Sequence, residues 1–316
     1  MIALFTLASC GGGSSNGFES KGRPVPSFSA DSALGFVQKQ VDFGPRNPNS
    51  EGHEQALNYL TEQLREYAGR DSVYQQRFEV AGYDGDTLSL TNVVAAFNVF
   101  AADRILLCAH WDTRPRTDQD PDFTKEGEPM IGANDGGSGV AVLLELARIF
   151  KDNPPPIGVD ILLFDGEDYG KQGETEMYFL GSRHWSKNQP VPNYQPRFGI
   201  LLDMVGGKDA VFPKERFSMS ESVALVNAIW SIAGELGHET LFPDEIGRYV
   251  QDDHIVMNQE LDFPTIDIIH HNLPSVDQPK TFPNFWHTSQ DNMENIDPAT
   301  LKVVGEVLLE LIYNRM

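Results

Sequence analysis

The stretch Arg104-Ile-Leu-Leu-Cys-Ala-His110 is a run of apolar residues that ends at an imidazole. Its apolar residues do not alternate with polar ones, which is typical of a strand buried on both faces of a sheet. Two later runs, 157–164 and 200–205, have the same apolar character, and a carboxylate stands at or just after the end of each. Segments with helical spacing of apolar residues lie between these runs. The sequence therefore predicts an α/β fold of three layers, in which a mostly parallel, twisted central sheet has helices on both faces.

Further strands are expected at 74–80, 88–97 and 265–269, and a first helix is expected at 31–41. A helix that follows the glycine-rich stretch 132–139 is expected to end at 153–156. Residue types that favour helix ends mark the other helices. They are Ser50 before the second helix, Ser218-x-x-Glu221 and Gly237 around a helix over 220–236, and Asp297-Pro298 before the last helix.

Composition limits the classes of function. The formal net charge of -22 disfavours nucleic acid as a partner, because binding to a phosphate backbone depends on Lys and Arg. The 316 residues can form one large core, and we expect a single catalytic domain over 27–316 that is a monomer. The two cysteines give no disulfide framework, and Cys108 is expected to be a buried thiol.

Residues 1–26 are expected to be a lipoprotein signal followed by a flexible tether. The stretch Leu7-Ala-Ser-Cys10 resembles a bacterial lipobox, with Cys10 as the residue that carries the lipid. This implies an exported protein anchored to the bacterial cell envelope, whose only membrane contact is that lipid. The run is short and lacks basic residues before it, which leaves open an ordinary apolar tail and whether Met1 is the true start. No later segment is long and apolar enough to span a bilayer.

Acidic or imidazole groups stand at or just after the ends of the predicted strands or in later loops. They are His110 with Asp112, Asp135, Glu167 with Asp168, Asp203 and His287. One such residue is usually a helix cap or a solvated turn, but a parallel sheet would bring all five places to one edge. Converging carboxylates repel one another unless a cation compensates, and these motifs contain no Lys or Arg. The pattern predicts a divalent metal site, and zinc suits mixed nitrogen and oxygen ligands.

The motifs His110-Trp-Asp112, 132–139, 164–168 and 201–203 resemble, in order and spacing, those of zinc aminopeptidases with two co-catalytic metals. The resemblance covers about residues 30–316. Two later motifs, Val250-Gln-Asp-Asp-His254 and 281–292, are similar to those of glutaminyl cyclases, which share that fold. The resemblance implies an enzyme that converts the N-terminal glutamine of peptides or proteins into pyroglutamate with release of ammonia.

The resemblance also implies roles for individual residues. One zinc ion per chain would be held by Asp135, Asp168 and His287, with Glu167 as the proton carrier. The carboxylates of Asp203 and Asp252 would assist catalysis. Substrate would be bound by Phe282, Trp286, Gln251 and, as a further wall, Trp185. In the animal cyclases the residue that matches Asp168 is Glu, which leaves open whether the shorter Asp168 binds metal through one oxygen or two.

Two other functions remain open from the sequence. The first is a dinuclear zinc aminopeptidase on the same fold, in which His110 binds a second metal. The second is a binding protein that has kept the fold without the chemistry, against which the intact Glu167 argues. We expect structural roles for His254, His270 and His271, which lie in or beside a predicted strand.

Overall fold

A computed structural model describes residues 18–171, 173–273, 275 and 279–316. The predicted lipobox with Cys10 lies outside the described residues. The described part of the predicted tether packs on the domain: the backbone N–H of Lys21 donates to the carbonyl of Asn314 at 2.8 Å, and Phe18 contacts Phe198. This differs from the expectation of a flexible tether up to Pro26. No helix among the described residues has the length and apolar character needed to cross a membrane.

Six strands form one sheet in the order β1-β2-β4-β3-β5-β6. Neighbours are antiparallel at β1/β2 and β2/β4 and parallel at the other three pairs, so β2 alone runs against the common direction. The prediction of a mostly parallel sheet is thus confirmed. The strands are β1 Val73–Ala81, β2 Thr87–Phe97, β3 Arg104–His110, β4 Gly158–Phe164, β5 Gly199–Asp203 and β6 Thr265–Ile269.

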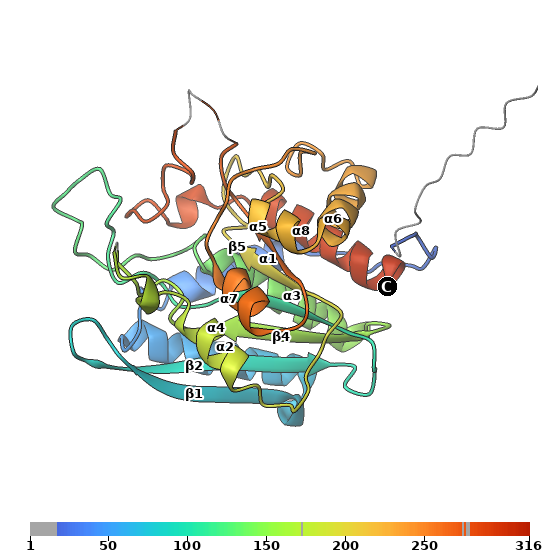
Figure 1. Cartoon of the computed structure of the whole chain (residues 1–316), viewed down its shortest axis with the longest axis horizontal. Helices are drawn as coiled ribbons and strands as arrows, with labels where there is room; N and C mark the ends of the chain where they lie inside the picture. Colours follow the sequence, from blue (N-terminus) through green and yellow to red (C-terminus); the bar gives the residue numbers. More distant parts are fainter. Residues whose placement is uncertain (1–17, 172, 274, 276–278) are drawn as a thin grey trace, which may run out of the picture.

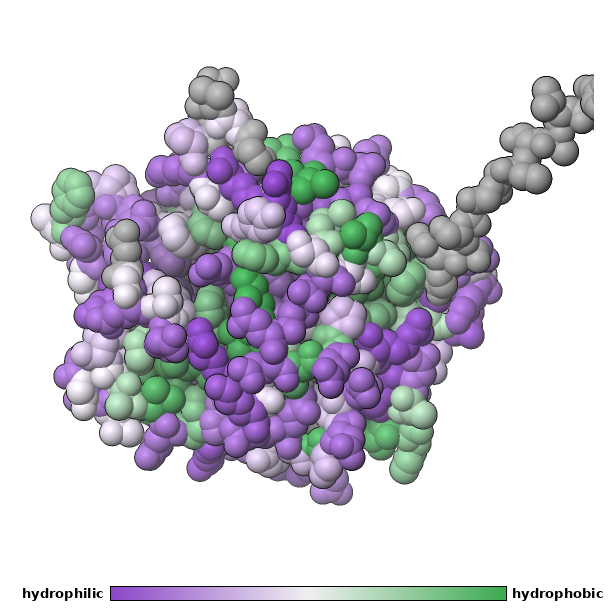
Figure 2. Space-filling view, in the orientation of Figure 1, coloured by the Kyte–Doolittle hydropathy of each residue, from purple (hydrophilic) through white to green (hydrophobic). Residues whose placement is uncertain are grey.

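Helices cover both faces of the sheet, which confirms the three predicted layers (Figure 1). One face carries α1 (Ala30–Val41), α2 (Glu51–Ala68), α3 (Gly137–Asp152) and α8 (Pro298–Glu310), with α6 (Val223–Glu235) packed on α8. The other face carries α4 (Leu180–Lys187), α5 (Arg216–Glu221) and α7 (Asp253–Glu260). The surface on the α4 and α7 side is largely hydrophilic, with hydrophobic residues in small separate groups (Figure 2).

The side chains of β3 alternate between two hydrophobic cores. Ile105, Leu107 and Ala109 lie in the large core beneath α3, whereas Leu106 and Cys108 lie in a smaller core beneath α4 and α7. The strand is therefore apolar on both faces, as its sequence predicts. The thiol of Cys108 is fully buried, which confirms that prediction.

The predicted start of the helix over 220–236 is wrong. Two helices, α5 and α6, occupy this region, and the Ser218/Glu221 capping box does not form. The carboxylate of Glu215 caps α5 by accepting from the backbone N–H groups of Phe217 and Ser218, and Ser222 caps α6. A buried carboxylate that accepts two backbone hydrogen bonds offers a stronger cap than the predicted serine. The other capping predictions, at Ser50 and at Asp297-Pro298, are confirmed.

Two glycines allow α3 to approach the sheet closely. A Cβ at Gly139 would meet the carbonyl oxygen of Leu202 at 2.2 Å, and a Cβ at Gly136 would meet the carbonyl oxygen of His110 at 2.4 Å. Neither contact is possible for a residue with a side chain unless the backbone shifts. The glycines of 132–139 thus bring the loop before α3 against the ends of β3 and β5.

Candidate active site

The carboxyl edge of the sheet gathers the predicted site residues. His110 ends β3 and Asp203 ends β5, while Glu167 and Asp168 lie in the loop after β4. Asp135 precedes α3, Asp252 is the N-cap of α7, and His287 lies in the long loop after β6. Because parallel strands end at the same edge, residues up to 177 positions apart in the chain meet there.

The three predicted zinc ligands, which we call the outer group, lie close together. Single ligand atoms from Asp135, Asp168 and His287 are all within 4.8 Å of one another. His287 Nε2 lies 3.2 Å from Asp168 Oδ2 and 3.5 Å from Asp135 Oδ2. All three residues are buried. Two carboxylates and one imidazole at these separations form a donor set of the kind that zinc takes.

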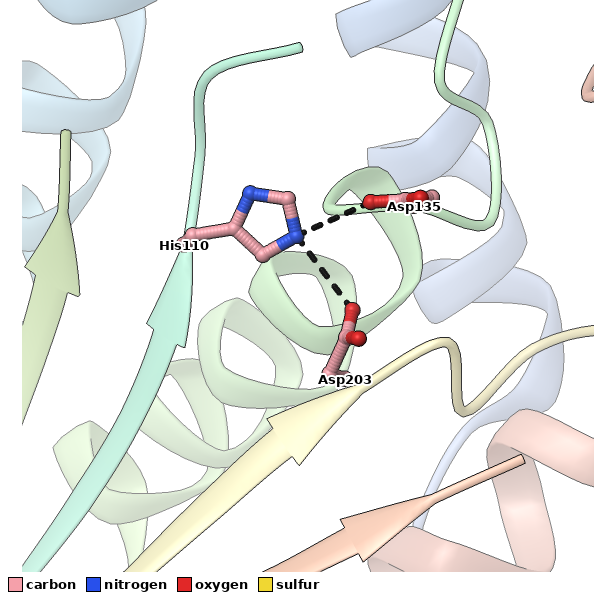
Figure 3. A group of neighbouring side chains, drawn as sticks. All are labelled: His110, Asp135 and Asp203. Atoms are coloured by element: carbon pink, nitrogen blue, oxygen red, sulfur yellow. Dashed lines mark hydrogen bonds and ion pairs between the residues drawn. The ribbon is translucent and has the colours of Figure 1, made fainter. Parts of the chain in front are cut away.

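A second set, which we call the inner group, consists of His110, Asp135 and Asp203, and its ligand atoms also lie within 4.8 Å of one another. Figure 3 shows the imidazole of His110 pointing between the two carboxylates, with Nε2 at 3.1 Å from Asp135 Oδ1 and 3.3 Å from Asp203 Oδ1. Asp135 thus presents one oxygen to each group. The geometry has the form of a pair of sites that share one carboxylate.

Buried hydrogen bonds hold the loops that carry these ligands. The carboxylate of Asp291 accepts from the backbone N–H groups of Asn134 and Asp135 at 2.8 and 3.0 Å. The carboxylate of Asp112 accepts from the backbone N–H groups of Glu167 and Asp168 at 3.0 and 3.3 Å. Asp112 therefore positions the pair that follows β4. The sequence shows the motif that contains Asp112, but it does not show that Asp112 accepts hydrogen bonds from the loop after β4.

A cavity of about 280 Å³ opens beside the outer group. The predicted ligands Asp135, Asp168 and His287 line it, together with Glu167, Asp203, Asp252 and Gln251. Its apolar walls are Phe179, Met204, Val250, Ile269, Phe282 and Trp286. The cavity therefore combines ligands, carboxylates and aromatic rings in one small space, as binding sites for small groups do.

The aromatic residues divide between this cavity and the core. The rings of Trp286 and His287 stack with centroids 3.6 Å apart, and Phe282 packs on Trp286 at 4.5 Å. The prediction that Trp185 forms a cavity wall is wrong. Its side chain packs with Phe164 and Tyr194 in the smaller core, because α4 directs that face of the helix toward the sheet. The sequence reasoning did not assign Phe179 to the cavity, although the segment 178–184 that contains it also resembles the cyclases.

Burial governs the ionisation of the carboxylates in the cavity. Burial, with Asp168 and Asp252 adding repulsion against the attraction of His110, raises the pKa of Glu167 well above its usual value. The Glu167 side chain remains 13% exposed, so it can meet a ligand in the cavity. Burial and the neighbouring Asp203 likewise raise the pKa of Asp252 well above normal. The protonated form of both carboxyl groups is therefore favoured more than it is for an exposed carboxyl group.

Without a metal ion, protonated imidazoles balance the negative charge of the clustered carboxylates. Burial disfavours the charged form of His287, but the carboxylates of Asp168, Asp118 and Asp135 outweigh it and raise its pKa to about 10. Burial would raise the pKa of Asp135, but His110 and His287 lower it below its usual range. The cluster thus requires positive charge. A divalent cation would supply that charge in place of the protons.

A buried arginine from outside the predicted motifs also lies beside the outer group. Arg114 Nη1 donates to Asp168 Oδ1 at 2.5 Å, and the Arg114 guanidinium also binds Asp118. Its position four residues after the end of β3 was visible in the sequence. That it reaches a residue after β4 was not visible, because this depends on the order of the strands.

The fold and the site together define a class: α/β proteins with a candidate metal site at the carboxyl edge of an open sheet. The chain belongs to Peptidase family M28, whose profile matches residues 92–312. This membership and the two ligand groups support zinc as the metal.

Several solved structures are similar over their whole length. The Zn-dependent exopeptidase from Parabacteroides distasonis is 44% identical with a TM-score of 0.88, and the alignment covers 92% of this chain and 100% of that one. The glutaminyl cyclase of Bacteroides thetaiotaomicron is 42% identical with a TM-score of 0.87, covering 93% and 100%. Among curated proteins, the glutaminyl-peptide cyclotransferase of Boiga dendrophila is 24% identical over 250 residues, or 70% of this chain. The chain spans 64% of the length of that relative.

Proposed function

We propose that the chain is a zinc-dependent glutaminyl cyclase, which converts the N-terminal glutamine of a peptide or protein into pyroglutamate and releases ammonia. The observation that carries the proposal is the small cavity, in which the outer group, Glu167 and two aromatic rings face the same space. Similarity to the glutaminyl cyclase of Bacteroides thetaiotaomicron over that whole chain supports it.

The outer group would hold one zinc ion per chain through Asp135, Asp168 and His287. The fit is supported by Asp168 Oδ2, a buried oxygen that accepts no hydrogen bond within the described part of the chain. When bound, zinc supplies Lewis acidity that polarises the γ-amide carbonyl of the substrate. Three ligands of this kind leave a fourth position for that carbonyl.

Glu167 would carry the proton. In the reaction the α-nitrogen bonds to the γ-carbonyl carbon, the bond from that carbon to the amide nitrogen breaks, and a proton moves from the former nitrogen to the latter. A carboxyl group whose pKa is raised well above its usual value is suited to both halves of this transfer. Glu167 lines the same cavity as the outer group, and from there it would reach both nitrogens of a bound substrate.

The remaining cavity residues would bind the substrate. Phe282 and Trp286 would hold the glutamine side chain and exclude water, which would otherwise favour hydrolysis. Asp203 and Asp252 would help to retain the proton that Glu167 moves, because their own pKa values are raised by burial. Gln251 is exposed at the cavity and would contact the peptide backbone.

The experiment that tests the proposal is mass analysis of products from a Gln-Xaa peptide and from a matched Leu-Xaa peptide. A cyclase converts only the former, and the product is the intact peptide less one ammonia. Release of free glutamine or free leucine would contradict the proposal and identify a peptidase. Protein treated with a chelator serves as the control, and activity should return on addition of zinc.

A dinuclear aminopeptidase is the second candidate, and one observation favours it. The inner group offers His110 and Asp203 for a second metal that would share Asp135 with the first. Metal analysis separates the two candidates, because two equivalents of zinc with cleavage of Leu-Xaa would support the aminopeptidase. One equivalent with cyclisation of Gln-Xaa would support the cyclase.

We also propose that the protein is exported as a monomer and anchored to the cell envelope through a lipid on Cys10. The sequence Leu7-Ala-Ser-Cys10 supports this. Labelling with a lipid precursor tests it: wild type should incorporate the label, and a Cys10→Ala variant should not.

A further inference from the structure

Arg114 is a buried arginine whose guanidinium group connects the loop after β3 to the loop after β4. Its side chain is 2% exposed. Nε and Nη2 bind the two carboxylate oxygens of Asp118 at 2.9 and 2.6 Å. Nη1 donates to Asp168 Oδ1 at 2.5 Å and to the Asp168 carbonyl at 3.2 Å, and Nη2 donates to Tyr178 Oη at 3.2 Å. An arginine fixed by this many contacts has one orientation.

The contact divides the two oxygens of Asp168 between different partners. Oδ1 is occupied by Arg114, whereas Oδ2 lies 3.2 Å from His287 Nε2 and accepts no hydrogen bond in the described ranges. The guanidinium also donates to the backbone carbonyl of the same residue, so it contacts both the backbone and the carboxylate of Asp168. Oδ2 is therefore the oxygen of Asp168 that faces His287 without a hydrogen-bond donor among the described residues.

The partner of Arg114 acts on a second ligand. Asp118 Oδ1 lies 3.6 Å from His287 Nδ1, while His287 Nε2 faces Asp135 and Asp168. A carboxylate beside one ring nitrogen favours a proton there and leaves the other nitrogen for a metal. Arg114 and Asp118 therefore contact two of the three residues of the outer group.

We propose that Arg114 is a positioning residue that restricts Asp168 to binding zinc through one oxygen, and that it holds Asp118 against His287. The inference rests on the proposed zinc site and goes beyond it. If Asp168 bound through both oxygens, its second oxygen would compete for the position that the substrate carbonyl needs. By occupying Oδ1, Arg114 keeps that position open.

The test uses protein in which cobalt replaces zinc, because the intensity of the cobalt d–d bands reports coordination number independently of activity. Arg114→Met frees Asp168 Oδ1, so we expect the metal to gain an oxygen and the molar absorbance of these bands to fall. The matched control is Arg116→Met. Arg116 lies on the same loop and contacts Tyr83 and the Gly170 carbonyl rather than a ligand, so its loss should leave the spectrum unchanged.

Arg114→Lys keeps the charge but not the planar guanidinium group with its several N–H donors. It provides a second variant if Arg114→Met does not fold. We expect it to show the same loss of band intensity. A wild-type spectrum in a folded, cobalt-loaded variant at position 114 would overturn the proposal, as would equal changes in the Arg116→Met control. The result is independent of the reaction: if the wild type fails to cyclise Gln-Xaa, the proposed function falls while the spectra still decide the role of Arg114.

Discussion

The outer and inner groups share Asp135 but have different surroundings. Every member of the outer group lines the cavity, and Arg114 and Asp118 orient two of its members. In the inner group, His110 does not line the cavity and is 1% exposed, and its Nδ1 faces Asp112 and Glu167 at 3.5 and 3.8 Å. A substrate in the cavity would therefore reach a metal held by the outer group. In the inner group, Asp135 and Asp203 line the cavity, but His110 does not. Similar ligand sets thus do not imply similar functions.

The largest expected effect separates the carboxylate proposed to move protons from those proposed to bind metal. Glu167→Gln should lower kcat by about 10²- to 10⁴-fold while the protein retains its zinc, because the amide cannot carry a proton and Glu167 is in neither group. Steady-state kinetics and metal analysis check this. Loss of zinc in this variant would mean that Glu167 is a ligand, and the division between the groups would be wrong.

Removal of one imidazole from each group tests which group binds the metal. His287→Ala should lose zinc, with a reduction in affinity of well over 10-fold, because it removes a ligand that lines the cavity. His110→Ala should keep one equivalent of zinc. The measurement is zinc content after dialysis against a weak chelator. If His110→Ala lost the metal and His287→Ala kept it, the assignment of the outer group would be reversed.

A smaller effect is expected at the aromatic wall. Trp286→Ala should reduce kcat/KM by roughly 10- to 100-fold, which corresponds to the loss of about 1.5–3 kcal/mol from a buried aromatic contact. The unfolding temperature should change little, because Trp286 is only partly buried. The matched variant is Trp185→Phe, which should lower stability and leave kcat/KM unchanged. The opposite pattern would place Trp185 in the cavity after all.

The smallest effect concerns a buried carboxylate outside both groups. Burial would raise the pKa of Glu215, but His254 and the backbone N–H groups at the start of α5 outweigh it and lower the pKa from 4.5 to about 2. Since the folded pKa is the lower one, Glu215 stabilises the fold above about pH 4.5, and this contribution disappears as the pH falls toward 2. Glu215→Gln should therefore cost about 2 kcal/mol at pH 7 and progressively less in acid.

Denaturant unfolding at pH 7 and pH 3 checks this prediction. The exposed Glu79, changed to Gln, is the control and should alter stability little at either pH. A cost at Glu215 that stays constant with pH would show that its charge contributes nothing to the fold.

Much of the fold was predictable because its signals are local. The apolar run 104–110 indicated a strand buried on both faces, and Asp297-Pro298 marked the start of α8. The motif spacing also predicted that Asp135, Asp168 and His287 would meet, because each lies in a loop at the same edge of a parallel sheet. The start of α5 was mispredicted because Glu215, whose carboxylate caps it, also accepts from the distant backbone of Val250.

The sequence by itself determined the strands, the residues that meet in the outer group and the family to which the chain belongs, since periodicity and motif spacing are properties of neighbouring residues. Only the tertiary structure decided that Arg114 contacts Asp168, that Trp185 lies in the core, and that His110 does not line the cavity. These facts depend on the strand order β4-β3-β5 and on how α4 packs against the sheet. Contacts between side chains more than fifty residues apart follow from packing, and no local pattern records them.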